Sequence, residues 1–223
     1  MPSGAEVFRK SETYYQSRRE DMLRFIPTGV GKVLEFGCGE GNFSALLKDR
    51  FSAETWAVEI NDRCAQIAAA KLHRVINNDA NRCLKDLPNR YFDCIICFDF
   101  LEHLADPYTF LTNLKSKLTQ DGVIISSIPN IRYFTVFRDF VLHGNWDYKD
   151  QGVMDRTHLR FFTYKSIVKM FQMLGFELVR IEGAHPTSSR SCRILQWLTF
   201  NALSDIRYKH FITVAKIGSH NLA

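Results

Sequence analysis

Three glycines directly after a short apolar strand limit the possible fold more than any other feature of the chain. Residues 32–36 have the composition of a strand, and Gly37, Gly39 and Gly41 follow before a helical pattern begins. Glycine lets the backbone approach a ligand closely, and the start of a helix offers unpaired N–H groups. A strand, a glycine-rich turn and a helix in this order predict the first unit of a nucleotide-binding α/β fold.

The spacing of the glycines disfavours two common classes of nucleotide-binding protein. Residue 42 is Asn, so the third glycine comes one position too early for the G-x-G-x-x-G turn of nicotinamide dehydrogenases. The Gly-Lys-Ser/Thr sequence of a phosphate-binding P-loop is absent as well. Glu35 stands shortly before Gly37, where a carboxylate would repel a pyrophosphate and suit a ligand with a cationic amine.

Strand and helix patterns alternate along the chain up to position 128. This alternation predicts a parallel sheet with helices on both faces. The expected strands of this part are 32–36, 55–59, 73–77, 92–98 and 123–128. After position 162 we expect a helix over 163–174, a strand over 176–181, a helix near 194–203 and a strand over 208–216. This ending predicts a final antiparallel strand at the edge of the sheet. At the other end of the chain, we expect a helix over 5–26 that is stopped by Pro27 and precedes the first strand.

Two further acids stand at the ends of predicted strands. Glu59 ends the second strand and can accept both hydroxyls of a ribose. Asp79 follows the third strand and can accept from an adenine amine. The carboxyl ends of parallel strands meet at one edge, so Glu35, Glu59 and Asp79 should line one crevice.

These motifs resemble those of the class I S-adenosylmethionine-dependent methyltransferases. Residues 34–42 are similar to the first motif of that family, 58–59 and 79–80 to its ribose and adenine sites, and 92–104 to its fourth-strand motif. The resemblance covers about residues 30–182. It implies a Rossmann-like fold whose mostly parallel seven-stranded sheet has the order 3-2-1-4-5-7-6, with the last-formed strand antiparallel.

The resemblance also implies S-adenosyl-L-methionine as the cofactor. It assigns the methionine end to Glu35, Gly37 and Gly39, the ribose to Glu59 and the adenine to Asp79. The full set of expected cofactor-binding residues is Glu35, Gly37, Cys38, Gly39, Glu59, Ile60, Asp79, Ala80 and Phe98.

We expect a single methyltransferase domain over 1–223 with an insertion at 130–162. Its expected parts are an N-terminal helical cap (1–28), a cofactor-binding half (29–129), the insertion, and a C-terminal half (163–223).

The insertion is unusually rich in aromatic residues, which suits a lid over the methyl acceptor. These aromatic residues are Tyr133, Phe134, Phe137, Phe140, Trp146, Tyr148, Phe161 and Phe162. The alternatives are a second small core or a dimer contact. Residues 131–142 favour an amphipathic helix, which leaves peripheral membrane contact open.

Residues 152–163 resemble a signature of bacterial methyltransferases found near glycan and lipopolysaccharide assembly enzymes. Arg156, His158 and Arg160 alternate within it, and an arginine there could hold a phosphate or carboxylate of the acceptor. The other interpretation is an internal brace between the insertion and the sheet. The sequence does not separate the two.

The candidate catalytic residues are His103 and, second, His158. A histidine is mostly neutral at pH 7, as a general base must be. Asp99, Glu102 and His103 have the spacing D-x-x-E-H, which resembles the metal-holding E-x-x-E-H of ubiquinone-biosynthesis O-methyltransferases and small-RNA 3′-end methyltransferases. The first acid is one carbon shorter here, so we expect no metal. The alternatives are a metal site and a purely structural polar pair, Glu102 and His103, at the start of a helix.

Composition favours a cytoplasmic protein. No apolar run is long enough for a spanning helix, and the start of the chain lacks the apolar core of a signal peptide. The six cysteines are expected to be reduced, and Cys94 and Cys97 should face opposite sides of one strand. The net charge is +5, and residues 185–223 contribute +4 of it. We interpret this basic segment as a solvated surface. The alternatives are that it binds a phosphate-bearing substrate, an acidic partner or nucleic acid.

The sequence thus predicts a methyltransferase that acts on an oxygen of a small molecule, a glycan or a lipid-linked sugar. Nucleic acid is disfavoured as a substrate because no motif for a flipped base is present. Two alternatives remain: a metal-assisted O-methyltransferase of the ubiquinone-biosynthesis type, and a non-catalytic module that binds the cofactor and regulates a partner. The chain is expected to be a monomer or a homodimer.

Overall fold

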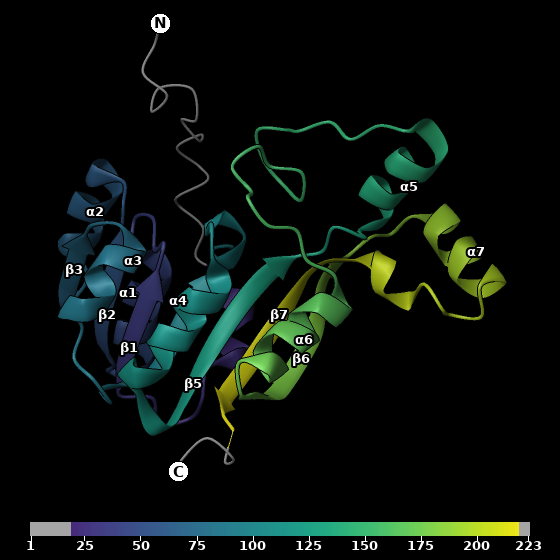
Figure 1. Cartoon of the computed structure of the whole chain (residues 1–223). Helices are drawn as coiled ribbons and strands as arrows, with labels where there is room; N and C mark the ends of the chain where they lie inside the picture. The colour runs from purple at the N-terminus through teal and green to yellow at the C-terminus, as the bar shows by residue number, and fades with distance from the viewer. Residues whose placement is uncertain (1–18, 219–223) are drawn as a thin grey trace, which may run out of the picture.

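The computed structural model describes residues 19–218, and its centre is a seven-stranded sheet (Figure 1). The strand order is β3-β2-β1-β4-β5-β7-β6, which confirms the order that the resemblance implies. The strands are β1 (Lys32–Phe36), β2 (Glu54–Glu59), β3 (Arg74–Asn77), β4 (Phe92–Phe98), β5 (Leu118–Pro129), β6 (Phe176–Pro186) and β7 (Tyr208–Ile217).

The first five strands are parallel, and β7 is antiparallel to both of its neighbours, β5 and β6. The expectation that the final antiparallel strand lies at the edge of the sheet is wrong, because β7 inserts between β5 and β6 and leaves β6 as the edge. A strand pattern alone carries no information on which neighbour a late strand pairs with.

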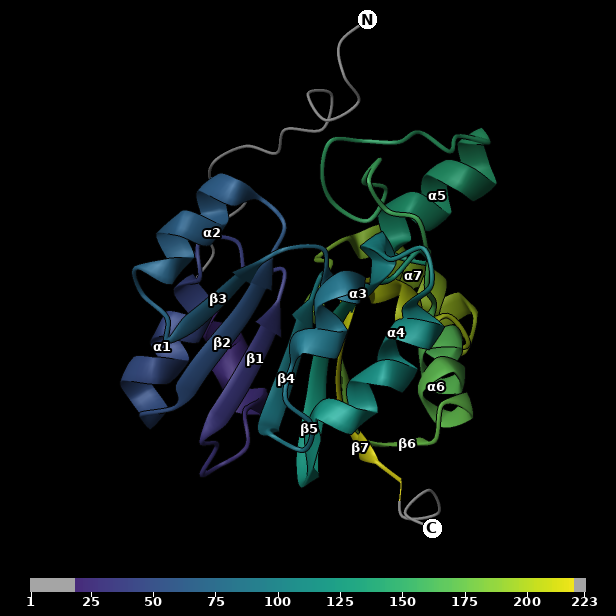
Figure 2. The same ribbon diagram turned by 60° about the vertical axis from the view of Figure 1, so that its left-hand side comes forward.

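Helices cover both faces of the sheet (Figure 2). Helices α1 (Asn42–Phe51) and α2 (Asp62–Ala69) pack on one face with the 3-10 helix η2 (Glu20–Phe25). Helices α3 (Ala80–Cys83), α4 (Pro107–Leu114) and α6 (Tyr164–Met173) pack on the other face. Helices α5 (Phe134–His143) and α7 (Arg190–Leu198) share a small hydrophobic cluster of Phe134, Cys192 and Ile206, and both project away from the sheet (Figure 1). The remaining elements are the 3-10 helices η3 (Leu84–Asp86), η4 (Leu101–His103), η5 (Lys115–Lys117) and η6 (Ser204–Arg207).

Strand β4 shows why this sheet is apolar on both sides. Successive side chains point to opposite faces of a strand. Ile95 and Cys97 enter the core under α4 and α6, whereas Cys94 and Ile96 enter the core under α1. Cys94 and Cys97 therefore face opposite sides, as expected, and all six cysteines of the chain are buried free thiols.

The described part of the predicted helix over 5–26 is the short helix η2, and residues 1–18 lie outside the described range. Two other helices shift slightly from their expected bounds. The helix expected over 131–142 is α5, and the helix expected near 194–203 is α7, which starts after its cap Ser189 and ends at Leu198. Among residues 19–218, no helix is long and apolar enough to cross a membrane.

Gly41 fixes the distance between the glycine loop and α2. Its φ is +74°, and a Cβ atom there would lie 2.9 Å from the Cβ of Ala68. Helix α1 therefore begins where only glycine satisfies both the backbone conformation and the contact with α2.

We predict that Gly41→Ala destabilises the fold more than Gly29→Ala. Gly29 has a similar φ of +77° but no atom within 4 Å of the position of a Cβ, so it isolates the backbone cost of about 1–2 kcal/mol. Gly41→Ala adds a steric clash, which raises the expected loss to roughly 2–5 kcal/mol. Urea unfolding of both variants measures the difference, and equal losses would contradict the packing role of Gly41.

Candidate functional site: a cofactor cavity beside a second, polar cavity

A cavity of about 600 Å³ opens at the carboxyl ends of the parallel strands. The turn between β1 and α1 forms its floor, where Gly37 and Gly39 have φ of +68° and +55°. All nine residues expected to bind the cofactor line this cavity, from Glu35 to Phe98. Their contacts with a bound cofactor stay predictions.

Glu59 is oriented by the backbone around it. Its Oε2 accepts from the N–H of Gly39 at 2.8 Å, and its Oε1 accepts from the N–H of Asn61 at 2.8 Å. Burial raises the pKa of the Glu59 carboxyl, and these hydrogen bonds oppose the shift. Each carboxylate oxygen keeps a further lone pair, which is what two ribose hydroxyls require.

Glu35 is a buried acid at the end of β1. Ser44 donates its hydroxyl to Oε2 at 2.5 Å. Burial raises the pKa of the Glu35 carboxyl to about 7, and the hydrogen bond from Ser44 and the charge of Arg19 only partly oppose it. A cationic ligand beside Glu35 would favour its ionised form.

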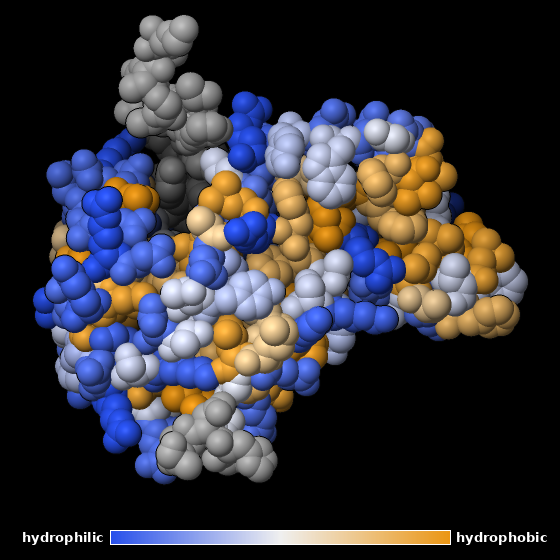
Figure 3. All heavy atoms as spheres, viewed as in Figure 1, coloured by the Kyte–Doolittle hydropathy of each residue, from blue (hydrophilic) through white to orange (hydrophobic). Residues whose placement is uncertain are grey.

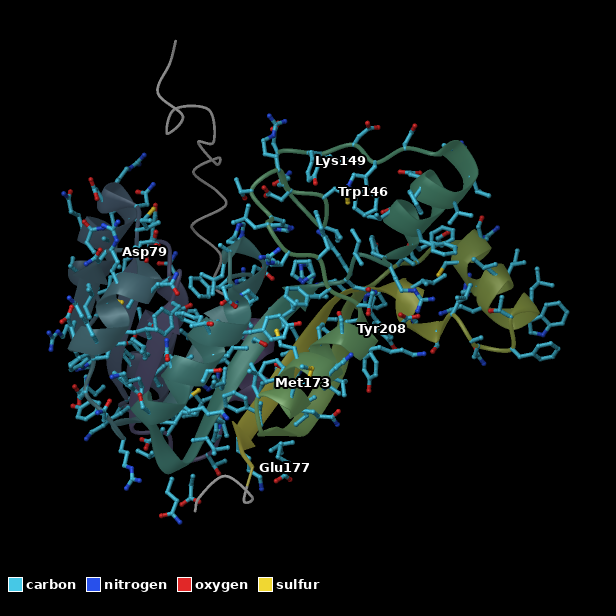
Figure 4. The ribbon with its side chains drawn as sticks, viewed as in Figure 1. Asp79, Trp146, Lys149, Met173, Glu177 and Tyr208 are labelled. Carbon is cyan, nitrogen blue, oxygen red and sulfur yellow. The ribbon has the colours of Figure 1, made fainter. Side chains whose placement is uncertain are left out.

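Asp79 caps the helix that follows the third strand. Its Oδ1 accepts from the N–H groups of Asn81 and Arg82, at 3.0 and 3.2 Å. Figure 4 labels Asp79 on the side of the molecule formed by α2 and α3. The expected adenine site therefore lies at the side of the cavity next to α2 and α3.

The second cavity, of about 460 Å³, lies between β4, β7 and the insertion. Seven of its nine lining residues carry polar side chains, and only Pro129 and Gly152 do not. The polar residues are Asp99, Glu102, Gln151, Asp155, His158, Lys209 and His210. Asp99 lines both cavities, so they are neighbours.

Asp99 joins three distant parts of the chain. It accepts from Arg19 at 2.6 Å and from the Ser127 hydroxyl at 2.8 Å, and His210 Nε2 lies 3.6 Å from its Oδ1. Burial alone would raise the pKa of Asp99, but Arg19, His210 and the hydrogen bond from Ser127 lower it to about 2. Burial lowers the pKa of His210 to about 4 despite the nearby carboxylate.

His103 and His158 meet between the two cavities. Their ring centroids are 4.8 Å apart; His103 lines the cofactor cavity and His158 lines the second cavity. Nδ1 of His103 is 3.1 Å from the Thr157 carbonyl, and Nδ1 of His158 is 3.0 Å from the Val153 carbonyl. A carbonyl only accepts, so each neutral ring donates from Nδ1 and keeps Nε2 as its basic nitrogen.

Glu102 completes a cluster with the two histidines. Each of the three residues offers one ligand atom within 4.8 Å of the others. Glu102 is 1% exposed, neither of its carboxylate oxygens accepts a hydrogen bond from residues 19–218, and burial raises the pKa of its carboxyl well above the usual range. The cluster contains His158 in place of Asp99, the first acid of the expected D-x-x-E-H set.

The signature over 152–163 braces the site. The Glu102 carbonyl accepts from the N–H groups of Leu159 and Arg160, at 2.8 and 3.0 Å. Arg160 also donates from Nε to the Ala105 carbonyl at 3.0 Å, and Arg156 pairs with Asp150 at 2.7 Å. Arg160 thus links the insertion to the segment after η4, as a brace would, whereas the ion pair of Arg156 stays within the insertion.

Four aromatic residues of the insertion, Phe140, Trp146, Tyr148 and Phe161, pack on one another. Trp146 lies between the rings of Phe140 and Phe161, with centroids at 5.6 and 5.7 Å, and Figure 4 labels it beside Lys149 in the chain beyond α5. None of the aromatic residues of the insertion, all of them described, is among those that line the two cavities. The insertion faces the second cavity with its polar residues Gln151, Asp155 and His158 instead.

Comparisons with known proteins agree with this geometry. A family model described as "Methyltransferase domain" (Methyltransf_23) matches residues 8–181. The chain belongs to this methyltransferase family. S-adenosylmethionine is therefore the cofactor of the domain.

Two relatives show the extent of the likeness. The crystal structure of a SAM-dependent methyltransferase from Archaeoglobus fulgidus has a TM-score of 0.68 at 25% identity and covers 95% of this chain and 96% of that chain. A probable S-adenosylmethionine-dependent methyltransferase of Mycolicibacterium smegmatis is 26% identical over 77% of this chain. The chain spans 59% of the length of that relative.

Sequence reasoning missed Arg19, Lys209 and His210. Arg19 lines the cofactor cavity, and Lys209 and His210 line the second cavity. Arg19 and His210 reach Asp99 from opposite ends of the described chain. No local pattern marks such contacts; the basic excess over 185–223 was the only signal near Lys209.

We predict that cofactor affinity depends on pH through Glu35. The free carboxyl has a pKa of about 7, and a bound cationic amine would favour its ionised form, so a proton leaves when the cofactor binds near neutral pH. The affinity for S-adenosylhomocysteine should fall on the order of tenfold from about pH 7.5 to about pH 5.5. Calorimetry at both pH values measures it.

Glu35→Gln is the control for this prediction, because it keeps the shape of the side chain and removes its titration. The variant should lose most of the pH dependence, leaving only that of the ligand. An unchanged dependence in Glu35→Gln would contradict the contact between Glu35 and the cofactor amine.

Proposed function

We propose that the protein transfers the methyl group of S-adenosylmethionine to a hydroxyl oxygen of a polar small molecule, a glycan or a lipid-linked sugar. The observation that carries the proposal is the position of His103 and His158 between the cofactor cavity and a second, polar cavity. A donor in the first cavity and an acceptor in the second would meet at these two imidazoles.

The second cavity supports a hydroxylated acceptor. Its carboxylates accept hydrogen bonds from hydroxyl groups, and Lys209 and Gln151 donate to them. A volume of about 460 Å³ is in the range of small-molecule sites. The polar residues Gln151, Asp155 and His158 would then form the cover of the acceptor, a role for which the sequence favoured the aromatic residues.

The reaction requires that the acceptor oxygen be positioned against the methyl carbon and that one base take the hydroxyl proton. The acceptor oxygen attacks the methyl carbon as the S–CH₃ bond breaks, and the bonding electrons remain on sulfur. The hydroxyl proton passes to Nε2 of an imidazole, for which His103 is the first candidate because it lines the cofactor cavity. The Thr157 carbonyl holds the His103 ring in the tautomer that this step requires.

A metal-assisted form of the same reaction is the second candidate. The buried carboxylate of Glu102, without a hydrogen bond from residues 19–218, and the two nearby imidazoles favour it. Zn²⁺, Mn²⁺ and Fe²⁺ accept this mixed donor set. A bound divalent cation would lower the pKa of the acceptor hydroxyl. A ubiquinone biosynthesis O-methyltransferase of Neisseria meningitidis is 26% identical to this chain over 107 residues, 44% of each protein.

The function is tested by following labelled methyl groups from S-adenosylmethionine. Free sugars, nucleotide sugars and lipid-linked sugars are offered separately, and mass spectrometry locates the methyl group on the product. We expect an O-methyl product. Methylation of nitrogen would contradict the proposal, and cofactor binding without transfer to any fraction would favour the regulatory module.

We predict that His103→Ala lowers kcat on the identified acceptor by about 10²–10⁴, the usual size of a general-base contribution. The cofactor dissociation constant should change little. His73→Ala is the matched control, because His73 is an exposed histidine just before the amino end of β3. A His103→Ala variant with unchanged kcat would transfer the catalytic role to His158.

A chelator separates the two candidate mechanisms. In the leading mechanism, dialysis against EDTA leaves kcat unchanged, because the imidazole alone takes the proton. Loss of activity that Mn²⁺ or Zn²⁺ restores, with about one metal ion per chain by mass spectrometry, would establish the second mechanism. Glu102→Gln should then lose the bound metal.

A further inference from the structure

Helices α5 and α7 carry an exposed apolar surface that the proposed reaction does not use. On α5 the exposed residues are Phe140, Val141 and Leu142, and on α7 they are Ile194, Trp197 and Leu198. Figure 3 shows hydrophobic surface over both helices, along the edge of the molecule that is farthest from α2. Single exposed apolar residues are ordinary, whereas a contiguous group marks an interaction surface.

An aromatic residue shortly after α7 strengthens this interpretation. Phe200 is 95% exposed, and Trp197 is 76% exposed. The φ of Phe200 is +48°, a left-handed conformation that favours glycine at this position after a helix. A bulky ring that strains its own backbone and is almost wholly exposed has no structural role that we can identify.

The charges around the apolar surface identify the partner. Residues 189–204 include Arg190 and Arg193 and no acidic residue, and both arginines are exposed. On α5, Arg138 is paired with Asp139 at 2.6 Å, so the two segments together carry a net positive charge from the two arginines of α7. Exposed arginines that alternate with exposed apolar and aromatic residues along one projecting helix match a bilayer surface, where the rings enter the headgroup region and the guanidinium groups contact phosphates.

We propose that the arm formed by α5 and by residues 189–204 docks on a membrane surface that contains anionic phospholipids. Phe200 and Trp197 enter the headgroup region, and Arg190 and Arg193 contact lipid phosphates. The two helices of the arm lie along the plane of the interface, as amphipathic helices with an exposed apolar side do. This proposal is independent of the identity of the methyl acceptor.

The test is sedimentation of the full chain with vesicles of phosphatidylcholine, with and without phosphatidylglycerol. We expect binding to the anionic vesicles, a blue shift of tryptophan emission, and loss of binding at high salt. Phe200→Gly with Trp197→Ser should weaken binding at least about tenfold. Arg190→Gln and Arg193→Gln should each weaken binding about fivefold.

Matched variants on α6 control for general surface changes. Met173 is 68% exposed on α6 (Figure 4), so Met173→Ser should leave vesicle binding unchanged. Lys165→Gln with Lys169→Gln removes two exposed charges from the same helix and should have a smaller effect than the two arginine variants together.

Phe200→Gly alone distinguishes a binding role from a folding role. Glycine relieves the left-handed backbone, so its melting temperature should equal or exceed that of the wild type while vesicle binding falls. Equal vesicle binding by wild type and Phe200→Gly/Trp197→Ser would overturn the proposal. A dimer in light scattering that Phe200→Gly dissociates, without vesicle binding, would assign the surface to a second copy.

Discussion

The hydrogen bonds from Leu159 and Arg160 to the carbonyl of Glu102 hold the insertion against the sheet, and the relation between the two cavities depends on them. Glu102 follows the end of β4, whereas its two donors come from the far end of the insertion. The same contact brings Thr157 to His103 and His158 to Glu102. Without it, the cofactor cavity would lose Thr157, the second cavity would lose the side formed by the insertion, and the imidazole pair would separate.

Asp99 gives this arrangement its second anchor. Its low pKa means that it stays ionised throughout the physiological range, so its contacts with Arg19 and Ser127 persist. It fixes the end of β4 to the segment before η2 and to β5, and it faces His210 of β7. Because Asp99 already accepts from Arg19 and Ser127, it is poorly placed to serve as a metal ligand. The candidate metal-binding cluster therefore consists of Glu102, His103 and His158, without the first acid of the D-x-x-E-H spacing.

The parts that could be predicted from the sequence rest on local chemistry. The acids at strand ends, Glu35, Glu59 and Asp79, and the glycine turn specify the cofactor cavity because each belongs to one strand and the turn after it. The family resemblance implies the position of β7 between β5 and β6, whereas the strand pattern alone predicts it at the edge. The contacts of Arg19, Lys209 and His210 depend on pairings between distant segments, which neither the resemblance nor a local pattern reveals. The aromatic content of the insertion predicts an aromatic lid, whereas the structure shows its polar residues facing the second cavity. Composition does not reveal which side chains turn inward.

Burial makes negative charge unfavourable in the cofactor cavity, and the positive charges of the cofactor reverse this preference. Glu35 and Glu59, which line the cofactor cavity, both have a pKa raised by burial. For Glu35, whose pKa rises from 4.5 to about 7, the protonated form stabilises the fold at low pH, and this contribution is lost as the pH rises through 7. S-adenosylmethionine brings a sulfonium and an ammonium group to the same cavity. The cofactor therefore offsets the cost of ionising buried carboxyls, and cofactor binding and the stability of this edge of the sheet are coupled.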